Sequence, residues 1–247
     1  MSNRLALVTG AVGGIGKAIA KRLSAVGVDV VISDLSGTDL NKSAADLNLP
    51  MIGADLSNDR SLDNLKDYFF KSGGYPDIII NAAGGVCKQT GADIENVTSN
   101  NWHEIFKANV DSAFYLARTF VPEMKKQKWG RIITISSGAG LRPSLTGIQA
   151  YTAAKHALVG LTKQLSSELG KFGITVNSIA PGFILSNPTT KKQWKSYGKK
   201  GQEELIKKIH TRRLGKPEDI ANTAVFLSSE EADWISGQII SVDGGIS

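Results

Sequence analysis

The amino-acid sequence predicts an α/β fold in which one doubly wound parallel sheet lies between two layers of helices. Short apolar, β-branched runs recur along the chain, and longer segments with helical periodicity separate them. The runs are apolar at nearly every position, which indicates strands that are buried on both faces. Glycines follow the runs where strands should end, and no linker-like tract interrupts the alternation. We therefore expect a single three-layer αβα domain of the Rossmann-like type over residues 1–247.

The expected strands follow from the apolar runs in chain order. They cover residues 5–9, 28–33, a third short run before Asp55, 77–81, 131–136, 174–180 and 238–242. Among the segments between them, residues 16–27 and 112–127 show helical periodicity. The lysines within 125–128 are then expected at the solvated end of a helix, because cations are favoured at a helix C-terminus.

The composition is that of an ordinary folded protein. Of 247 residues, 21% are charged and 41% are hydrophobic, which argues against a disordered chain. Cys87 is the single cysteine, so we expect neither a disulfide framework nor a zinc site, and a reducing, cytoplasmic setting fits best. The three histidines lack metal-ligand spacing, so no metal is predicted. The start of the chain reads as neither a signal peptide nor a membrane span.

The formal net charge is +6, which is compatible with a polyanionic partner. Much of the excess is concentrated in residues 125–128 and 191–213 rather than spread over the chain. We therefore expect neither nucleic acid nor a membrane as partner.

Residues 9–16, "TGAVGGIG", place a glycine-rich turn between the first strand and a helix. Gly10, Gly14 and Gly16 form a G-x3-G-x-G pattern, which differs from the dinucleotide fingerprint G-x-G-x-x-G. The physical role is shared, because glycine lets the backbone turn tightly and approach a pyrophosphate at the helix N-terminus. The alternative is a tight turn that binds nothing, but the strand-turn-helix context favours a nucleotide.

Two aspartates follow predicted strands. Asp34 ends the second strand, where a carboxylate can accept hydrogen bonds from both adenosine ribose hydroxyls and would repel a 2′-phosphate. NAD is therefore predicted over NADP, although Asp34 could instead cap a helix. Asp55 could accept from the adenine amine or cap the following helix, and the sequence leaves both roles open.

Tyr151 and Lys155, in "YTAAK", lie four residues apart in a segment with helical character. Side chains at this spacing share one face of a helix and can touch. Such a pair is common, so the spacing alone does not distinguish a solvated pair from an acid and the cation that tunes it.

Seven short motifs occur in order along nearly the whole chain. They are "TGAVGGIG", "NAAG", "KANV", "ISSGAG", "YTAAK", "NSIAPGFI" and "ISGQIISVDGG". With these motifs in register, the chain resembles the short-chain dehydrogenase/reductase family from end to end. The resemblance implies an NAD(P)-dependent oxidoreductase acting on CH–OH groups. The implied catalytic set is Asn109, Ser137, Tyr151 and Lys155. The implied cofactor contacts are Gly10, Gly14, Ile15, Gly16, Asp34, Asp55, Leu56, Asn81, Ala82, Ala83, Tyr151, Lys155, Pro181, Gly182, Ile184 and Ser186.

Each member of the implied catalytic set has a physical role. Tyr151 would be the acid and base, and Lys155 would lower its pKa from ~10 and donate to the nicotinamide ribose. Ser137 would hold the substrate oxygen. Ser136 competes for that role, and the family pattern of serine followed by x-x-G favours Ser137. Asn109 would open its helix and position a water that links Lys155 to solvent.

The resemblance makes residues 187–212 a substrate lid. Its lysines would either attract an anionic substrate, such as an acyl-carrier conjugate or a carboxylate, or keep a mobile lid soluble. These lysines are Lys191, Lys192, Lys195, Lys199 and Lys200. Arg142 could contact a substrate carboxylate or be an exposed loop arginine. Cys87 could face the cleft, although a buried or inert thiol is the more common case.

Three functions compete. The leading prediction is an NAD-dependent enzyme for a secondary alcohol or ketone, such as a sugar, polyol or small cyclic alcohol. A 3-oxoacyl-carrier (ACP or CoA) reductase is the alternative among enzymes, and Asp34 argues against it because such reductases usually prefer NADPH. A catalytically silent nucleotide-binding regulator typically loses the tyrosine or lysine, and this chain keeps both. The resemblance also implies a homotetramer, with the helices around Asn109 and Tyr151 paired between subunits.

Overall fold

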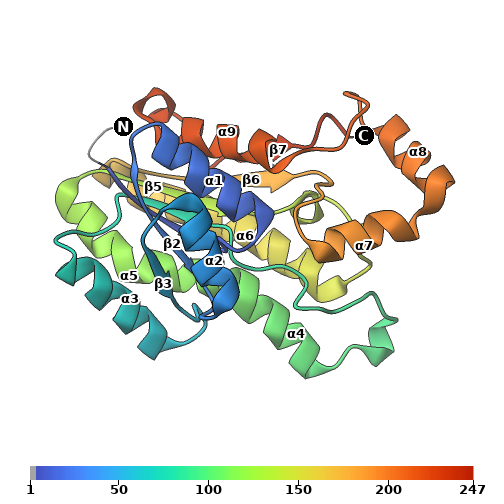
Figure 1. Cartoon of the computed structure of the whole chain (residues 1–247), viewed down its shortest axis with the longest axis horizontal. Helices are drawn as coiled ribbons and strands as arrows, with labels where there is room; N and C mark the ends of the chain where they lie inside the picture. The colour runs from blue at the N-terminus through green and yellow to red at the C-terminus, as the bar shows by residue number, and fades with distance from the viewer. Residues whose placement is uncertain (1–3, 247) are drawn as a thin grey trace.

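The computed structural model describes residues 4–246, and within them it forms one sheet of seven strands (Figure 1). The strands are β1 (Leu5–Thr9), β2 (Asp29–Asp34), β3 (Met51–Gly53), β4 (Ile78–Asn81), β5 (Gly130–Ile135), β6 (Ile174–Pro181) and β7 (Ile239–Val242). Their order is β3-β2-β1-β4-β5-β6-β7, and all neighbours are parallel. The strands coincide with the predicted apolar runs to within one residue at nearly every end, so the doubly wound α/β fold is confirmed.

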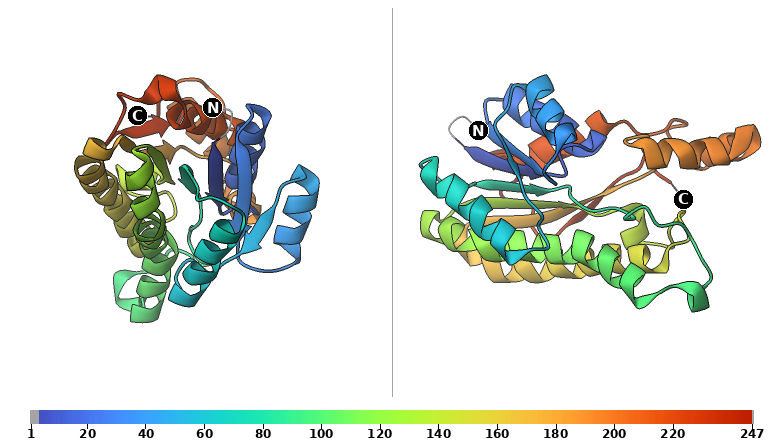
Figure 2. Two further views of the ribbon diagram at one scale, coloured as in Figure 1. Left: turned by 90° about the vertical axis from the view of Figure 1, so that its left-hand side faces the viewer. Right: turned by 60° about the horizontal axis from the view of Figure 1, so that its bottom comes forward.

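Helices cover both faces of the sheet (Figure 2). One layer holds α1 (Gly14–Ala25), α2 (Thr38–Leu47) and α9 (Pro217–Ser228). The other holds α3 (Asp59–Lys71), α5 (Ser112–Gln127) and α6 (Gln149–Leu169), with α4 (Ser99–Phe106) packed against α6. None of the helices within residues 4–246 combines the length and apolar character needed to cross a membrane.

The core consists of two apolar clusters that the sheet separates. Leu7 and Val8 are consecutive in β1 and fully buried, yet they belong to different clusters because successive side chains of a strand point to opposite faces. Val8 packs in the layer of α1 and α9, and Leu7 packs in the layer of α3 and α5. This two-sided burial is the reason that the strand sequences are apolar at nearly every position.

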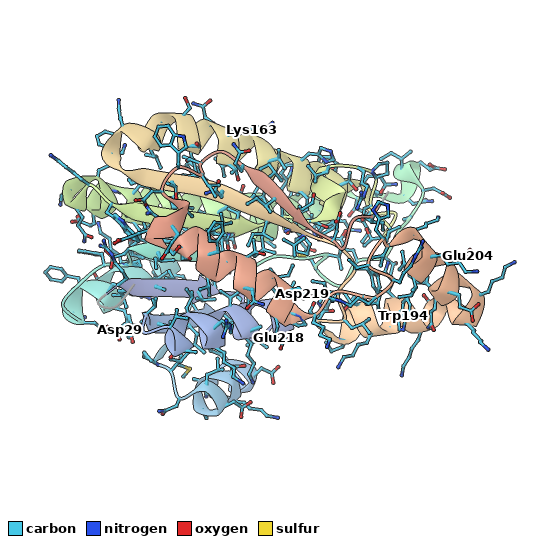
Figure 3. All side chains as sticks on the ribbon, turned by 90° about the horizontal axis from the view of Figure 1, so that it is seen from above. Asp29, Lys163, Trp194, Glu204, Glu218 and Asp219 are labelled. Atoms are coloured by element: carbon cyan, nitrogen blue, oxygen red, sulfur yellow. The ribbon has the colours of Figure 1, made fainter. Side chains whose placement is uncertain are left out.

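The carboxyl ends of the strands carry the irregular parts of the molecule. Helices α7 (Pro188–Ser196) and α8 (Gly198–Lys208) project beyond this end of the sheet (Figure 1). Asp29, at the start of β2, lies at the opposite end of the molecule from Trp194 on α7 and Glu204 on α8 (Figure 3). At the other end, α5 stops at Gln127 and Lys128 adopts a left-handed conformation with φ +56°, as expected for a helix end at 125–128.

Candidate active site

The glycine turn after β1 is held by close backbone contacts. Gly10 has φ +66°, and a Cβ on it would collide with the carbonyl of Ala82 just after β4. A Cβ on Gly14 would collide with the carbonyl oxygen of Ser186, which accepts a hydrogen bond from the Gly14 N–H. A Cβ on Gly16 would collide with the carbonyl of Gly10. The three glycines therefore bring the turn, the end of β4 and the loop after β6 into contact.

The N-terminus of α1 opens onto this turn without a side-chain cap. Gly13 is the N-cap residue, and the first turn of α1 contains no acidic residue. The first N–H groups of a helix lack intrahelical partners, and the helix dipole makes this end positive. The local structure therefore suits a phosphate group of a ligand.

Asp34, at the end of β2, faces the glycine turn. Its Oδ2 accepts a hydrogen bond of 2.9 Å from the Val12 N–H, and its Oδ1 accepts one of 2.8 Å from the Leu35 N–H. The N-cap of α2 is Gly37, without any side-chain cap. The alternative reading of Asp34 as a helix cap is therefore wrong.

Asp55, after β3, does not cap a helix either. Its Oδ1 accepts hydrogen bonds from the N–H and the hydroxyl of Ser57, at 3.0 and 2.7 Å. Asn58 is the residue that caps α3, by accepting from the Ser61 N–H. The next residue, Leu56, is buried in the core, so its side chain is turned away from the surface on which Asp55 is exposed.

A cavity of about 630 Å³ lies at the carboxyl ends of the central strands. Three members of the implied catalytic set line it: Ser137, Tyr151 and Lys155. The predicted cofactor residues that also line it are Ile15, Ala82, Ala83, Pro181, Gly182, Ile184 and Ser186. The structure therefore brings together residues from the glycine turn, β4, β5, α6 and the loop after β6.

Other predicted residues lie around this cavity rather than in its wall. Gly10, Gly14, Gly16 and Asp34 form the adjoining turn, and Asp55 and Leu56 follow β3. Asn81 is buried beneath the turn, where its Oδ1 accepts a hydrogen bond of 2.9 Å from the Thr9 hydroxyl. Asn81 thus supports the backbone of the site from below.

The two neighbouring serines after β5 point in different directions. Ser136 is buried, and its hydroxyl donates to the Ile179 carbonyl oxygen at 3.0 Å within the sheet. The Ser137 hydroxyl accepts from the Ala139 N–H at 3.1 Å and is a hydrogen-bonding neighbour of the Tyr151 hydroxyl. Strand alternation explains the difference, and it directs Ser137 toward the tyrosine.

Lys155 is buried on α6 and has a single hydrogen-bond acceptor among the described residues. Its Nζ donates to the Ile135 carbonyl oxygen at 2.9 Å and lies 5.6 Å from the centre of the Tyr151 ring. Burial away from water lowers the pKa of Lys155 from 10.5 to about 7, and the Cys87 thiolate form would oppose this shift. The ammonium and the neutral amine are therefore both accessible near neutral pH.

Burial raises the pKa of Tyr151, while the hydrogen bond with Ser137 opposes that rise. The sequence predicted a lowered pKa, on the argument that the Lys155 ammonium and the positive charge of the oxidised nicotinamide together stabilise the phenolate. In the protein alone desolvation is the larger effect, and the partly neutral Lys155 does not outweigh it. The tyrosine is therefore a protonated group at neutral pH.

Asn109 lies in a π-helical turn, Lys107–Asp111, between α4 and α5. Its Nδ2 donates to the carbonyl oxygens of Gly85 and Ile105 at 2.9 and 2.8 Å, and its Oδ1 accepts from the Gly85 N–H at 3.0 Å. The helix is opened at this residue, as expected. The side chain fixes the loop after β4 and does not line the cavity.

Helices α7 and α8 form the segment that the sequence predicted as a lid. Lid residues spaced three or four apart within each helix line the cavity: Thr190 and Gln193 on α7, Gly201, Glu204 and Lys208 on α8, and Tyr197 between the two helices. The five lysines that we considered for anion binding are exposed, and none of them lines the cavity. This arrangement gives them no direct contact with a molecule bound inside.

Arg142 and Cys87 also have defined environments. Arg142 lines the cavity, but its guanidinium pairs with the Asp243 carboxylate at 3.2 Å and donates to the Ile246 carbonyl oxygen at 3.1 Å. Its charge is therefore largely compensated. Cys87 is exposed outside the cavity wall, and partial burial of the thiol together with Glu104 raises its pKa, which keeps it a thiol.

From the sequence we placed Tyr197 in the lid but missed its pairing with Gln193 on α7; Tyr197 is the residue that directly follows this helix. The Gln193 Nε2 donates to the Tyr197 hydroxyl at 2.7 Å and to the Leu145 carbonyl oxygen across the cavity at 3.2 Å. Their spacing of four residues within a helix was the signal that could have found them. The interpretation of this segment rested on the charge of its lysines and not on the helical spacing of its polar residues.

Comparisons with known proteins agree with the geometry. A family model described as enoyl-(acyl carrier protein) reductase matches residues 10–247. The chain is 34% identical to a D-beta-hydroxybutyrate dehydrogenase of Cupriavidus necator, with 99% of this chain and 98% of that protein covered. It is also 34% identical to a 2-dehydro-3-deoxy-D-gluconate 5-dehydrogenase of Bacillus subtilis, with 99% and 95% covered.

Solved structures show the same fold with either nicotinamide cofactor. A 3-oxoacyl-[acyl-carrier protein] reductase with bound NAD from Brucella melitensis matches with a TM-score of 0.86 and 30% identity, covering 99% of this chain and 91% of that one. A variant of the actinorhodin polyketide ketoreductase with NADPH matches with a TM-score of 0.90 and 25% identity, covering 99% and 98%. These relatives and structures are named as dehydrogenases or reductases, and their names give different substrates.

Proposed function

The chain belongs to the short-chain dehydrogenase/reductase family, and we propose that it is an NAD-dependent enzyme that transfers a hydride between nicotinamide and a secondary alcohol or its ketone. It is an oxidoreductase that acts on CH–OH groups, as its relatives are. The observation that carries the finer proposal is that Ser137, Tyr151 and Lys155 line one cavity beside a glycine turn that ends at an uncapped helix. Sugars, polyols and small cyclic alcohols are the proposed substrate range.

The turn residues fit a dinucleotide, and Asp34 supports NAD as the dinucleotide. The pyrophosphate would lie at the N-terminus of α1, and Asp34 would accept from the adenosine ribose hydroxyls. Residues 11–13 carry no cation that could hold a 2′-phosphate, and Lys17 on α1 is paired with Asp46 at 2.7 Å. When bound, nicotinamide would supply the carbon that accepts or gives up the hydride.

The side chains of the protein would transfer the proton that accompanies the hydride. In oxidation, the substrate O–H proton would pass to the Tyr151 phenolate, and in reduction the Tyr151 O–H would give a proton to the ketone oxygen. Ser137 would donate a hydrogen bond to the same oxygen and keep it within reach. The ammonium form of Lys155 would stabilise the phenolate. Because burial raises the pKa of Tyr151, the phenolate that oxidation needs becomes more available at higher pH, so oxidation should accelerate as the pH rises.

The direct test is a screen of secondary alcohols with NAD+ at alkaline pH. Replacing Tyr151 by Phe should lower kcat/KM by about 10²- to 10⁴-fold, the usual contribution of a general acid–base group. Ser137→Ala should lose activity as well, whereas Ser136→Ala should retain it, because the Ser136 hydroxyl bonds the sheet. An unchanged rate in Tyr151→Phe would refute the proposal.

The cofactor is tested separately, by comparing initial rates of ketone reduction with NADH and NADPH. The wild type should prefer NADH, and Asp34→Ala should lose most of that preference, because the variant no longer repels a 2′-phosphate. Asp63→Ala serves as a control, since it removes an exposed carboxylate on α3, in the helix layer on the other face of the sheet from α1 and α2. A wild type that prefers NADPH would overturn the NAD assignment and leave the alcohol chemistry standing.

Reduction of a 3-oxoacyl group on a carrier is the second candidate. The observation that favours it is the row of exposed lysines on the outer side of α7 and α8, which could attract an acidic carrier. Acetoacetyl-CoA with NADPH is the matching assay. Faster turnover of this pair than of any simple ketone with NADH would favour the second candidate.

We also propose that the chain assembles into a homotetramer. The support is that large apolar side chains are exposed on two faces: Trp234 before β7 is fully exposed, and Phe114 on α5 is 45% exposed. Helices α5 and α6 and the C-terminal strand would form the contacts. Light scattering should give the tetramer mass for the wild type and a smaller mass for Trp234→Glu.

A further inference from the structure

Most polar side chains that line the cavity already form hydrogen bonds or ion pairs with other residues of the protein. The hydroxyls of Ser144 and Thr146 bond each other at 2.8 Å. Asn187 and Thr190 form the capping box of α7. Arg142 is engaged by Asp243 and by a carbonyl oxygen. These groups therefore have little hydrogen-bonding capacity left for a ligand.

Gln193 and Tyr197 differ from these groups. A carbonyl oxygen can only accept, so the bond to the Leu145 carbonyl fixes the amide nitrogen of Gln193 on that side. The same nitrogen donates to the Tyr197 oxygen, which leaves the Tyr197 proton free to donate. Among residues 4–246, no partner bonds this proton or the Oε1 of Gln193. One donor and one acceptor thus remain side by side on the cavity wall.

The environment holds this pair in place and keeps it neutral. The Phe183 ring lies 5.8 Å from the Tyr197 ring and 5.9 Å from the Trp194 ring, so Tyr197 sits in an aromatic cluster. Burial raises the pKa of Tyr197, which keeps the hydroxyl protonated at neutral pH. The nearby wall is apolar, with Leu145, Phe183 and Leu205.

We propose that Gln193 and Tyr197 select a substrate that has an apolar body and a second, uncharged hydrogen-bonding group, a hydroxyl or a carbonyl, away from the reacting carbon. This inference rests on the proposed alcohol dehydrogenase function and narrows its substrate class. A donor and an acceptor together suit a hydroxyl, which uses both, and a carbonyl uses the donor. Away from the reacting carbon, charge gives no comparable selection, because Glu204 and Lys208 carry opposite signs and Arg142 is paired with Asp243.

Three probes that share one ring test the proposal with NAD+: cyclohexanol, 1,3-cyclohexanediol and 3-hydroxycyclohexanecarboxylate. The wild type should show the highest kcat/KM for the diol. In Tyr197→Phe the ratio of diol to cyclohexanol should fall by about 3- to 10-fold, as expected for one lost hydrogen bond. The loss should appear mainly in KM, because the bonded group is remote from the reacting carbon.

Two further variants distinguish substrate selection by this pair from the role of Gln193 in holding α7 against the loop at Leu145. Gln193→Met removes the bond to Leu145 as well, so it should raise KM for all three probes and for the diol most. Lys195→Met, on the exposed side of the same helix, is the matched control and should leave the probe ratios unchanged.

The results distinguish the inference from the function on which it rests. Equal losses for all probes in Tyr197→Phe would overturn the inference, because the ring would then only pack, while the dehydrogenase function would stand. A preference for the carboxylate probe that disappears in Lys208→Met would also overturn it, in favour of an anionic substrate. Failure of the wild type to oxidise any of the three probes would overturn the inference and remove small cyclic alcohols from the proposed range, while the dehydrogenase function would still be tested by the screen with sugars and polyols.

Discussion

Two buried cations lie at opposite ends of the same strand and have different surroundings. Arg131, near the start of β5, is 1% exposed; it forms an ion pair with Asp233 and stacks 4.2 Å from the centre of the Trp129 ring. Lys155 is 4% exposed and donates to the carbonyl oxygen of Ile135, the last residue of β5. In the described part of the chain, no carboxylate lies within 4.0 Å of its ammonium.

The difference separates a structural cation from a functional one. The Arg131 guanidinium also donates to the carbonyl oxygens of Ser229 and Gly130, so each of its three nitrogens has an acceptor and its charge has a partner. Lys155 bears a charge that the fold does not neutralise, and its pKa drops to about 7. A buried charge without a partner destabilises the folded protein. Such a group at a cavity with Tyr151 and Ser137 is a candidate for catalysis.

Replacing Lys155 by Met should produce the largest effect, and in opposite directions for activity and stability. We expect kcat/KM for alcohol oxidation to fall by about 10²- to 10⁴-fold, because the phenolate of Tyr151 loses the cation that stabilises it. The free energy of unfolding at pH 7 should rise by about 1 to 3 kcal/mol. The variant no longer buries an ammonium group, and this gain exceeds the cost of leaving the Ile135 carbonyl oxygen without its donor. Steady-state kinetics and urea denaturation measure the two quantities.

A fall in stability in Lys155→Met would contradict the comparison, because it would mean that the lysine contributes to the fold as Arg131 does. Circular dichroism on the variant checks that the lost activity is not lost structure. Tyr151→Phe, measured in parallel, should lose activity without the gain in stability.

Replacing Arg131 by Met should destabilise the protein by about 2 to 4 kcal/mol, because two buried carbonyl oxygens lose their donor and Asp233 loses its partner. The activity per folded molecule should stay near that of the wild type, since Arg131 lies at the end of the sheet away from the cavity. Arg131→Lys keeps the charge but not the planar contact with Trp129, so it should recover only part of the stability. Full stability in Arg131→Met would remove the distinction between the two cations.

The fold could be predicted from the sequence because its main determinant is local. The apolar run at 131–136 located β5 to within one residue, as the other runs located their strands. The partner of Arg131 could not be predicted in this way. Asp233 lies 102 residues further along the chain, and no local pattern connects the two.

The candidate site was predicted in part for the same reason. Tyr151 and Lys155 lie one helical turn apart, so their proximity follows from the sequence spacing. The direction of the pKa of Tyr151 did not follow, because it depends on burial by distant segments. The alternative that Asp34 caps a helix failed because Gly37 takes that place. The sequence left open whether the lid lysines attract an anion or keep the lid solvated, because the direction in which α7 and α8 turn these lysines depends on how the helices pack.

The pH dependence of stability provides a smaller and more specific test of Lys155. Below the folded-state pKa of about 7, Lys155 is protonated in both the folded and the unfolded protein, so the free-energy cost of burying its charge does not change with pH. Between about 7 and 10.5 the unfolded chain holds a proton that the folded protein lacks, so stability rises with pH. From pH 6.5 to pH 9 the unfolding free energy of the wild type should rise relative to that of Lys155→Met by roughly 2 to 3 kcal/mol, enough to remove the advantage of the variant. A constant difference between the two proteins would show that the lysine is not titrating in this range.

Lys125 on α5 completes the comparison, because it is a cation at the surface and should give the smallest effect. Its Nζ lies 3.1 Å from the Glu168 carboxylate and 4.9 Å from the centre of the Phe172 ring. Both charged side chains are partly exposed, at 32% and 52%, so water screens the pair and the net gain is small. Lys125→Met should lower the unfolding free energy by less than about 1 kcal/mol and leave kcat/KM unchanged. A loss as large as that of Arg131→Met would mean that the presence of an ion pair, and not its burial, sets the contribution of a cation in this fold.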